Sequence, residues 1–216
     1  MTHLSPRLIL ASASPRRREL LSLLGLPFTV VPSSYEEPPA PSSPVDLPAF
    51  VTDLARHKAR AVAQIEPDAL VLGADTLVSL SVGAVGVPLG KPIDTADACR
   101  MLRLLSGALH TVHTGVVLFR SLPDGSLTEP LCMAVRTEVR FRTLSDAMIA
   151  DYVATGEPLD KAGAYGAQGY AAPFIESFTG DFYNVVGLPL CEVGRLLERS
   201  GLLWWQHRQN MPSLPG

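Results

Sequence analysis

The chain of 216 residues contains few charged side chains, few cysteines and no apolar run long enough to span a membrane. Charged residues make up 18% of the sequence, and the net charge is −3. Proteins that bind nucleic-acid backbones are usually basic overall, so this balance argues against nucleic acid as a partner. A local cluster of arginines is then better explained by a small anion.

The cysteines are odd in number, stand in apolar surroundings and lack the spacing of metal ligands. They are Cys99, Cys132 and Cys191. This pattern predicts buried, unpaired thiols in a reducing compartment. The N-terminal segment does not read as a secretory signal because Pro6, Arg7 and Ser12 interrupt it. We therefore expect a cytoplasmic protein with no membrane partner.

Apolar periodicity and helix-breaking residues predict alternating strands and helices. The predicted strands cover residues 7–11, 28–32, 69–80, 111–120 and 134–142, and the predicted helices cover residues 16–24, 48–65, 94–106, 145–156 and 188–199. Residues 35–48, with five prolines, and residues 83–92 are predicted as loops. A hydrophobic content of 47% allows one domain or two tightly packed lobes. The irregular alternation favours an α/β fold around a mixed sheet.

Residues 8–21 read as a buried strand, a small polar turn and the start of a helix. Ser14 can cap the helix and Pro15 suits its first position, where no N–H donor is needed. Unpaired N–H groups and the positive end of the helix dipole would then lie beside Ser12, Arg16 and Arg17. This arrangement suits a phosphate group. The alternative is a surface helix with a solvated, arginine-rich face.

Asp75 interrupts the apolar strand predicted over residues 69–80. A buried carboxylate costs several kcal/mol unless it is paired or bound to a metal. A turn-capping aspartate at the end of a strand is one reading. Apolar residues continue on both sides, which favours a metal ligand or a general base that activates water.

Several other polar residues, each taken alone, are best predicted as solvent-exposed. They indicate a function only when they are considered as a set. Lys58 lies beside the apolar stripe of a helix, Lys91 lies in a constrained Gly-Lys-Pro loop, and Glu37 precedes the proline-rich segment. Residues 160–169 interleave three glycines with small residues. In this segment Asp160 and Lys161 can pair or contact a phosphate, and the Gln168 amide can contact a nucleobase edge. The whole set indicates a phosphate-handling enzyme that uses a divalent metal.

These residues stand in six ordered motifs that resemble the Maf family of nucleoside triphosphate pyrophosphatases. The motifs cover residues 10–21, 73–76, 90–92, 105–110, 160–169 and 184–190. The resemblance implies hydrolysis of a nucleoside triphosphate to the monophosphate and pyrophosphate, assisted by Mg or Mn. It also implies a mixed, twisted central sheet flanked by helices, with two lobes and a deep cleft, as in inosine triphosphate pyrophosphatases. A catalytic domain over residues 1–200 and a tail over residues 201–216 would follow.

The resemblance also implies roles for individual residues. Asp75 matches the proton acceptor of the family. The positions that match the lining of the cleft are Ser12, Arg16, Arg17, Glu37, Lys58 and Lys91. The branch that acts on dTTP and UTP has the residues found here as Arg16, Thr76 and Gln168. The branch that acts on 7-methyl-GTP has a bulky residue, a glutamine and a glutamate at these positions.

Three questions stay open at the level of sequence. The family is associated with cell division, so a nucleotide-sensing regulator is an alternative to the enzyme, and the 7-methyl-GTP branch is a second alternative. Glu37 and Asp75 could share or exchange the tasks of holding metal and activating water. The residues do not decide between a monomer and a homodimer.

Overall fold

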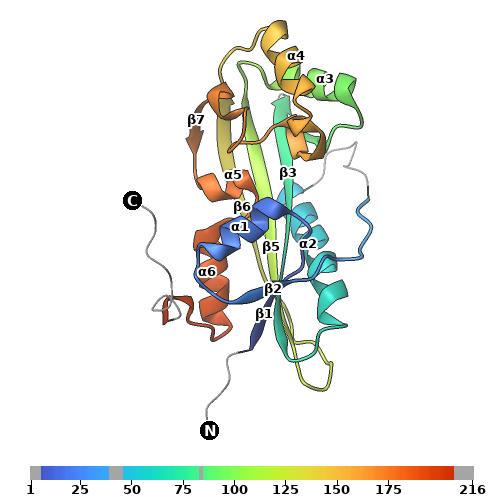
Figure 1. The fold of residues 1–216 in the computed structure, drawn as a ribbon, viewed down its shortest axis with the longest axis vertical. Helices are drawn as coiled ribbons and strands as arrows, with labels where there is room; N and C mark the ends of the chain where they lie inside the picture. The colour runs from blue at the N-terminus through green and yellow to red at the C-terminus, as the bar shows by residue number, and fades with distance from the viewer. Residues whose placement is uncertain (1–5, 39–45, 83–84, 207–216) are drawn as a thin grey trace.

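The computed structural model describes residues 6–38, 46–82 and 85–206. Seven strands form one mixed sheet in the order β2-β1-β3-β5-β6-β7, and β4 pairs with β3 beside this path (Figure 1). The strands are β1 (Arg7–Leu10), β2 (Phe28–Val30), β3 (Ala69–Val82), β4 (Val85–Leu89), β5 (Leu109–Ser121), β6 (Leu131–Phe141) and β7 (Ile175–Thr179).

Six α-helices and three short 3₁₀ turns surround this sheet in the described residues. The helices are α1 (Pro15–Ser22), α2 (Leu47–Ala63), α3 (Thr95–Leu105), α4 (Asp146–Ala154), α5 (Phe182–Val186) and α6 (Leu190–Arg199). The 3₁₀ turns are η1 (Glu157–Asp160), η2 (Ala162–Ala164) and η3 (Ala172–Phe174). The result is the mixed α/β fold expected from the sequence.

The central strand β3 changes its partner along one edge. On the other edge β5 accompanies it without interruption, from the Ala69–Ser121 pair to the Leu80–His110 pair. On the first edge β3 pairs in parallel with β1 as far as Leu72, and it pairs in antiparallel fashion with β4 from Val78 onward. Among the described strands, none pairs with residues 73–77 on this edge. Asp75 and Thr76 lie in the middle of that gap.

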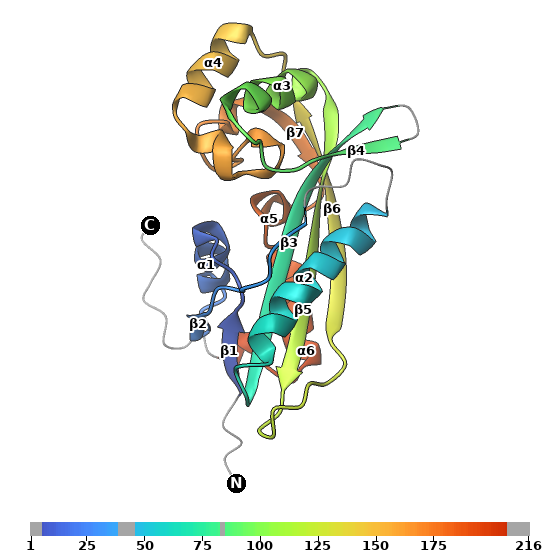
Figure 2. The ribbon, with the colours of Figure 1, turned by 90° about the vertical axis from the view of Figure 1, so that its right-hand side faces the viewer.

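The helices of one face divide into two hydrophobic clusters, which form two lobes. In the first cluster, α1 and α6 pack on β1 and on the early part of β3. In the second cluster, α3 and α4 pack on the far ends of β3, β5 and β6. Figure 2 shows α3 and α4 at one end of the sheet, well separated from α1 and β1 at the other end. The gap in the pairing of β3 falls between the two lobes.

Helix α2 covers the opposite face and lies very close to the strands. A Cβ atom on Gly73 of β3 would lie 2.6 Å from the carbonyl oxygen of Ala55. A Cβ atom on Gly115 of β5 would lie 2.5 Å from the carbonyl oxygen of Val51. Both neighbours are main-chain atoms of α2, so only glycine permits this approach. The approach brings Lys58 of α2 to the face of β3 that carries Asp75.

Most of the predicted elements are confirmed, with shifts of one to three residues at their ends. The loop predicted over residues 83–92 is wrong in part, because β4 forms within it and pairs with β3. Pro88 is tolerated there because β4 is an edge strand that pairs with β3 alone. The missing N–H donor of a proline is acceptable in such a strand, because one of its sides has no partner strand. Residues 1–5, 39–45 and 83–84 of the segments discussed above lie outside the described residues.

The expectation of buried cysteines is also wrong in part. All three thiols are free, but Cys99 and Cys132 are only half-buried and Cys191 is exposed. Cys191 follows Leu190 at the start of α6, whose core-facing side is made by Val193, Leu196 and Leu197. The cysteine therefore falls on the solvent side of the helix, which its apolar neighbours in the sequence did not reveal.

The C-terminal segment contributes more to packing than its sequence suggested. Trp204 packs against the first hydrophobic cluster, and its Nε1 donates to Glu198 Oε1 at 2.9 Å. Residues 207–216 of the predicted tail lie outside the described part of the chain. None of the helices described is long and apolar enough to cross a membrane.

We expect Gly115→Ala to lower the free energy of unfolding by about 1–3 kcal/mol, the usual cost of forcing extra volume into a packed interior. Its new methyl group would meet the main chain of α2, which cannot move aside alone. Gly86→Ala is the matched control, because its Cβ would meet only side-chain atoms, the nearest of them Leu47 Cδ1 at 3.4 Å. Thermal and chemical denaturation of both variants measures the difference. Equal stabilities would contradict the close packing of α2.

Candidate active site

A cavity of about 800 Å³ lies between the two lobes, where β3 lacks a partner strand. All twelve residues selected from the sequence line it. They are Ser12, Ser14, Arg16, Arg17, Glu37, Lys58, Asp75, Thr76, Lys91, Asp160, Lys161 and Gln168. These residues come from segments far apart in the chain, so the fold brings the predicted set together in one place. Their individual roles remain predictions.

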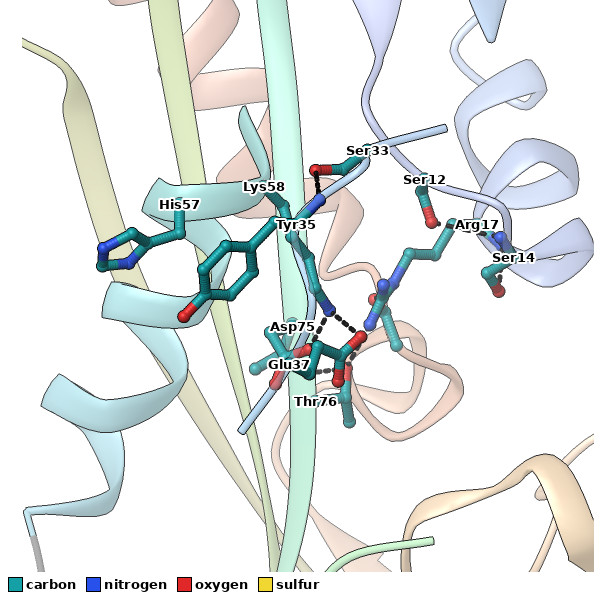
Figure 3. A network of polar contacts seen from close by, with 12 residues as sticks. Ser12, Ser14, Arg17, Ser33, Tyr35, Glu37, His57, Lys58, Asp75 and Thr76 are labelled. Atoms are coloured by element: carbon teal, nitrogen blue, oxygen red, sulfur yellow. Dashed lines mark hydrogen bonds and ion pairs between the residues drawn. The ribbon is translucent and has the colours of Figure 1, made fainter. Parts of the chain in front are cut away.

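Lys58 lies between two carboxylates at the centre of the cavity. Its Nζ donates to Asp75 Oδ1 at 2.5 Å and contacts Glu37 Oε1 at 2.7 Å (Figure 3). Lys58 is 8% exposed and Asp75 is 6% exposed. The prediction that Lys58, taken alone, is a solvent-exposed lysine is therefore wrong. Lys91, in contrast, is exposed at the rim of the cavity.

The lysine also controls the protonation of Glu37. Partial burial acts to raise the pKa of Glu37, but the hydrogen bond and charge of Lys58, with the charges of Lys91 and Arg17, outweigh it. The net pKa of Glu37 therefore lies below its ordinary value, and the group is ionised at neutral pH. Its contribution to stability is present above the ordinary pKa and is lost as the pH falls through the lowered one.

The start of α1 forms as the sequence predicts. Ser14 caps the helix by accepting from the N–H of Arg17 at 3.5 Å, and Pro15 occupies the first helical position. Ser12 is buried at the cavity wall, and its Oγ accepts from the N–H of Ser14 at 3.2 Å. Arg18 is exposed and does not line the cavity. The helix terminus thus faces the space between the lobes with its positive end.

Arg17 links α1 to the other face of β3. Its Nε donates to the carbonyl of Gly187 at 2.9 Å, and its Nη2 donates to Thr76 Oγ1 at 3.1 Å. Burial lowers the pKa of Arg17 and the carboxylates of Asp75 and Glu37 oppose this, so the guanidinium keeps its charge. The guanidinium has five N–H donors, and within the described residues it uses only two of them, one to the Gly187 carbonyl and one to Thr76. The others remain for an anion.

The far lobe contributes the glycine-rich segment. Lys161 Nζ donates to Asp160 Oδ1 at 2.7 Å and to the carbonyl of Glu157 at 2.5 Å. Asp160 Oδ2 lies 3.7 Å from Arg16 Nη1, so an ion pair joins the two lobes across the cavity. Gln168 is exposed and lines the cavity, and it carries the only side-chain amide among the described lining residues.

The electrostatic balance of the cavity differs from that of the whole chain. Five side-chain cations line it, namely Arg16, Arg17, Lys58, Lys91 and Lys161. Three carboxylates oppose them, those of Glu37, Asp75 and Asp160. An excess of two positive charges in a chain of net charge −3 concentrates a polyanion at this point. The cavity can bind a polyphosphate beside the carboxyl groups of Asp75 and Glu37.

Comparison with known proteins agrees with this chemistry. Residues 7–200 match the family model described as Maf-like protein. The chain belongs to the Maf-like family. Five of the six motifs that carried the resemblance in the sequence contribute residues to the lining of the cavity, and the motif at residues 105–110 contributes none among the described lining residues.

Several curated Maf relatives match over nearly the whole chain. The dTTP/UTP pyrophosphatase of Moorella thermoacetica is 53% identical over 205 residues, which cover 92% of this chain and 97% of that protein. The dTTP/UTP pyrophosphatase of Geobacter sulfurreducens is 50% identical and covers 91% and 98%, respectively. The dTTP/UTP pyrophosphatase of Symbiobacterium thermophilum is 50% identical and covers 90% and 94%.

The structure adds a cavity residue, Tyr35, and a residue buried behind the site, Thr114, that sequence reasoning missed. Tyr35 lines the cavity and stacks on His57, with ring centroids 4.9 Å apart, which orders the segment that carries Glu37 (Figure 3). Thr114 of β5 is fully buried, and its Oγ1 lies 3.0 Å from Thr76 Oγ1. Thr114 interrupts an apolar strand as Asp75 does, so the same signal could have found it. No local signal marks Tyr35.

We expect Lys58→Met to raise the pKa of Glu37 from its lowered value. The substitution removes the hydrogen bond and the nearest charge, while the partial burial that acts in the opposite direction remains. Carbon-detected NMR titration of the glutamate carboxyl groups measures the midpoint. Lys91→Met is the control, and we expect a smaller rise because Lys91 acts on Glu37 through its charge alone. An unchanged midpoint in Lys58→Met would contradict the pairing seen here.

Proposed function

We propose that this chain hydrolyses dTTP and UTP to the nucleoside monophosphate and pyrophosphate. The observation that carries the proposal is the convergence of Asp75, Glu37 and five cations on one cavity. The proposal draws further support from three relatives that are about half identical over more than nine-tenths of the chain, each named dTTP/UTP pyrophosphatase. A nucleoside triphosphate is a polyanion, and the excess of positive charge in the cavity suits such a substrate.

The reaction breaks the bond between the α-phosphorus and the oxygen that bridges to the β-phosphorus. A water molecule attacks the α-phosphorus, Asp75 accepts its proton, and pyrophosphate leaves. Lys58 orients the Asp75 carboxylate through the 2.5 Å contact, which holds the proton acceptor in place beside the substrate. Arg17, Lys91 and the N–H groups at the start of α1 hold the phosphate oxygens and stabilise the charge that develops on them.

A divalent cation, Mg²⁺ or Mn²⁺, fits the donors of this cavity. Within the described residues, hydrogen bonds engage one oxygen of Asp75 and the ion pair one oxygen of Glu37, which leaves a second oxygen on each. No larger group of His, Cys, Asp and Glu ligands exists in the described residues. One or two carboxylates, completed by substrate phosphates, is the usual protein share of a Mg²⁺ site. When bound, the cation would neutralise phosphate charge and make the phosphorus more electrophilic.

Selection of a pyrimidine base is assigned to Arg16, Thr76 and Gln168. The Gln168 amide can donate and accept at once, which matches the alternating donor and acceptor groups of uracil and thymine. Asp160 and Lys161 stand beside it and complete this end of the cavity. The three residues follow the pattern of the dTTP and UTP branch, which disfavours the 7-methyl-GTP alternative.

A nucleotide-sensing regulator of cell division would need the same cavity without turnover. The complete set of carboxylates and cations favours the enzyme, because a sensor has no use for a buried base paired with lysine. We further infer that residues 1–200 form the catalytic domain. A cytoplasmic location is proposed as well, supported by the three free thiols.

We expect Asp75→Asn to reduce pyrophosphate release from UTP by about 10²–10⁴-fold, the usual contribution of a general base. The asparagine keeps the size of the side chain, so nucleotide affinity should stay within a few-fold by calorimetry. The assay uses purified protein with Mg²⁺ or Mn²⁺ and a panel of nucleoside triphosphates. Asp151→Asn, at an exposed position of α4, is the matched control. Normal turnover in Asp75→Asn would remove it as the base, and nucleotide binding without turnover by the wild type would favour the sensor.

We expect Gln168→Glu to lower the preference for UTP over GTP by about 10-fold or more. An ionised carboxylate cannot donate to a uracil oxygen, and a lost hydrogen bond costs about 1–3 kcal/mol. The ratio of kcat/KM for the two substrates measures the change. Gln64→Glu, exposed at the end of α2, controls for the added charge. An unchanged ranking of substrates would remove Gln168 from base selection.

A further inference from the structure

The short turn that carries Gln168 is tied to the protein at both ends. Before Gln168, Gly166 donates its main-chain N–H to Tyr152 Oη at 3.1 Å. After it, Tyr170 donates its main-chain N–H to Glu157 Oε2 at 2.9 Å. Within the turn, the N–H of Gly169 donates to the carbonyl of Gly166 at 3.1 Å. Gln168 is therefore exposed on a turn whose flanking residues are both held.

The two anchors are themselves joined. The Tyr152 hydroxyl donates to Glu157 Oε1 at 3.0 Å, so the glutamate accepts from Tyr152 and Tyr170 with different oxygens. Tyr152 is 4% exposed, and its ring packs edge to face against Phe174. Burial raises the pKa of Tyr152 well above its ordinary value, which keeps the hydroxyl protonated and able to donate.

Close packing makes the arrangement rigid. A Cβ atom on Gly166 would lie 2.6 Å from Glu157 Oε1, and one on Gly169 would overlap the same carboxylate. The two glycines thus let the turn lie directly on Glu157. A methyl group at either position would push the carboxylate away from its hydrogen-bond donors.

Two other contacts near the turn do not depend on the Glu157 side chain. Lys161 donates to the main-chain carbonyl of Glu157, which every substitution of the side chain leaves in place. The Tyr165 hydroxyl lies 2.9 Å from His110 Nε2, in a buried cluster with Phe141. Neither Glu157 nor Tyr152 is among the described residues that line the cavity. Any effect of Glu157 on the substrate must therefore pass through the turn.

We propose that Glu157, together with Tyr152, is a positioning residue for pyrimidine selection, because it fixes the turn that presents Gln168 to the base. This inference rests on the proposed function, in which Gln168 contacts the base. The hydrogen bonds that join Glu157 and Tyr152 to the turn, here called the relay, affect the orientation of the Gln168 amide. They involve none of Asp75, Lys58 and Glu37. Loss of the relay should change which base is accepted and leave the hydrolytic step in place.

The test is a double-mutant cycle between Glu157→Ala and Gln168→Ala, with kcat and KM measured for UTP and CTP. We expect Glu157→Ala to lower the UTP-to-CTP ratio of kcat/KM by about 10-fold, mainly through KM, with kcat for UTP within about 3-fold. In the Gln168→Ala background, Glu157→Ala should have no further effect on the ratio, because residues that act through one another are not additive. Tyr152→Phe and Gly169→Ala should each reproduce part of the loss.

Glu157→Gln keeps one of the two acceptor oxygens and should restore part of the preference that Glu157→Ala loses. Glu176→Ala, an exposed glutamate on β7, is the matched control, and melting temperatures of all variants report on folding. Fully additive effects, an unchanged ratio, or an equal loss of kcat for both substrates would overturn the proposal.

Binding measured in the Asp75→Asn background separates this proposal from the proposed function. Calorimetric dissociation constants for UTP and CTP require no turnover, so they report on Gln168 even if the wild type releases no pyrophosphate. A UTP preference that falls on addition of Glu157→Ala supports the positioning role. A preference that survives it refutes that role, whatever the outcome for hydrolysis.

Discussion

A buried ammonium group shared by two carboxylates is the interaction on which the site depends. Removing charges from water costs several kcal/mol for each ion, and only close pairing offsets this cost. Lys58 pairs with Asp75 and Glu37 at once, so it joins α2, β3 and the segment after β2. The pairing requires α2 to lie against the sheet, and the missing side chains of Gly73 and Gly115 allow that approach.

The cavity separates two tasks along one strand. Consecutive side chains of a strand point to opposite faces, so Asp75 faces α2 and Lys58 while Thr76 faces Arg17. Both side chains still reach the same cavity, because no described strand covers this edge of β3. The groups proposed for hydrolysis, Asp75 and Lys58, thus lie on one side of the strand, and Thr76, which is proposed to select the base, lies on the other. The two lobes contribute unequally, since the far lobe supplies mainly Asp160, Lys161 and Gln168.

The parts of the site that sequence reasoning found have local signals. A helix cap beside arginines and a carboxylate within an apolar strand are visible within about ten residues, so the start of α1 and Asp75 could be predicted. The burial of Lys58 could not, because its partner Asp75 lies 17 positions away on another element. The pairing of β4 and the relay through Glu157 depend on distances between segments, and the exposure of Cys191 depends on how α6 is turned.

The open edge at residues 73–77 has a consequence for how the protein avoids unwanted association. A strand edge without a partner normally offers a template for another chain and invites aggregation. Here the unpaired stretch is mostly buried and is bounded by β1 on one side and β4 on the other, so it is recessed within the sheet. An incoming strand would meet both neighbours before it could pair along these residues. The sheet thus keeps an unpaired edge at the cavity without offering a long free edge to another chain.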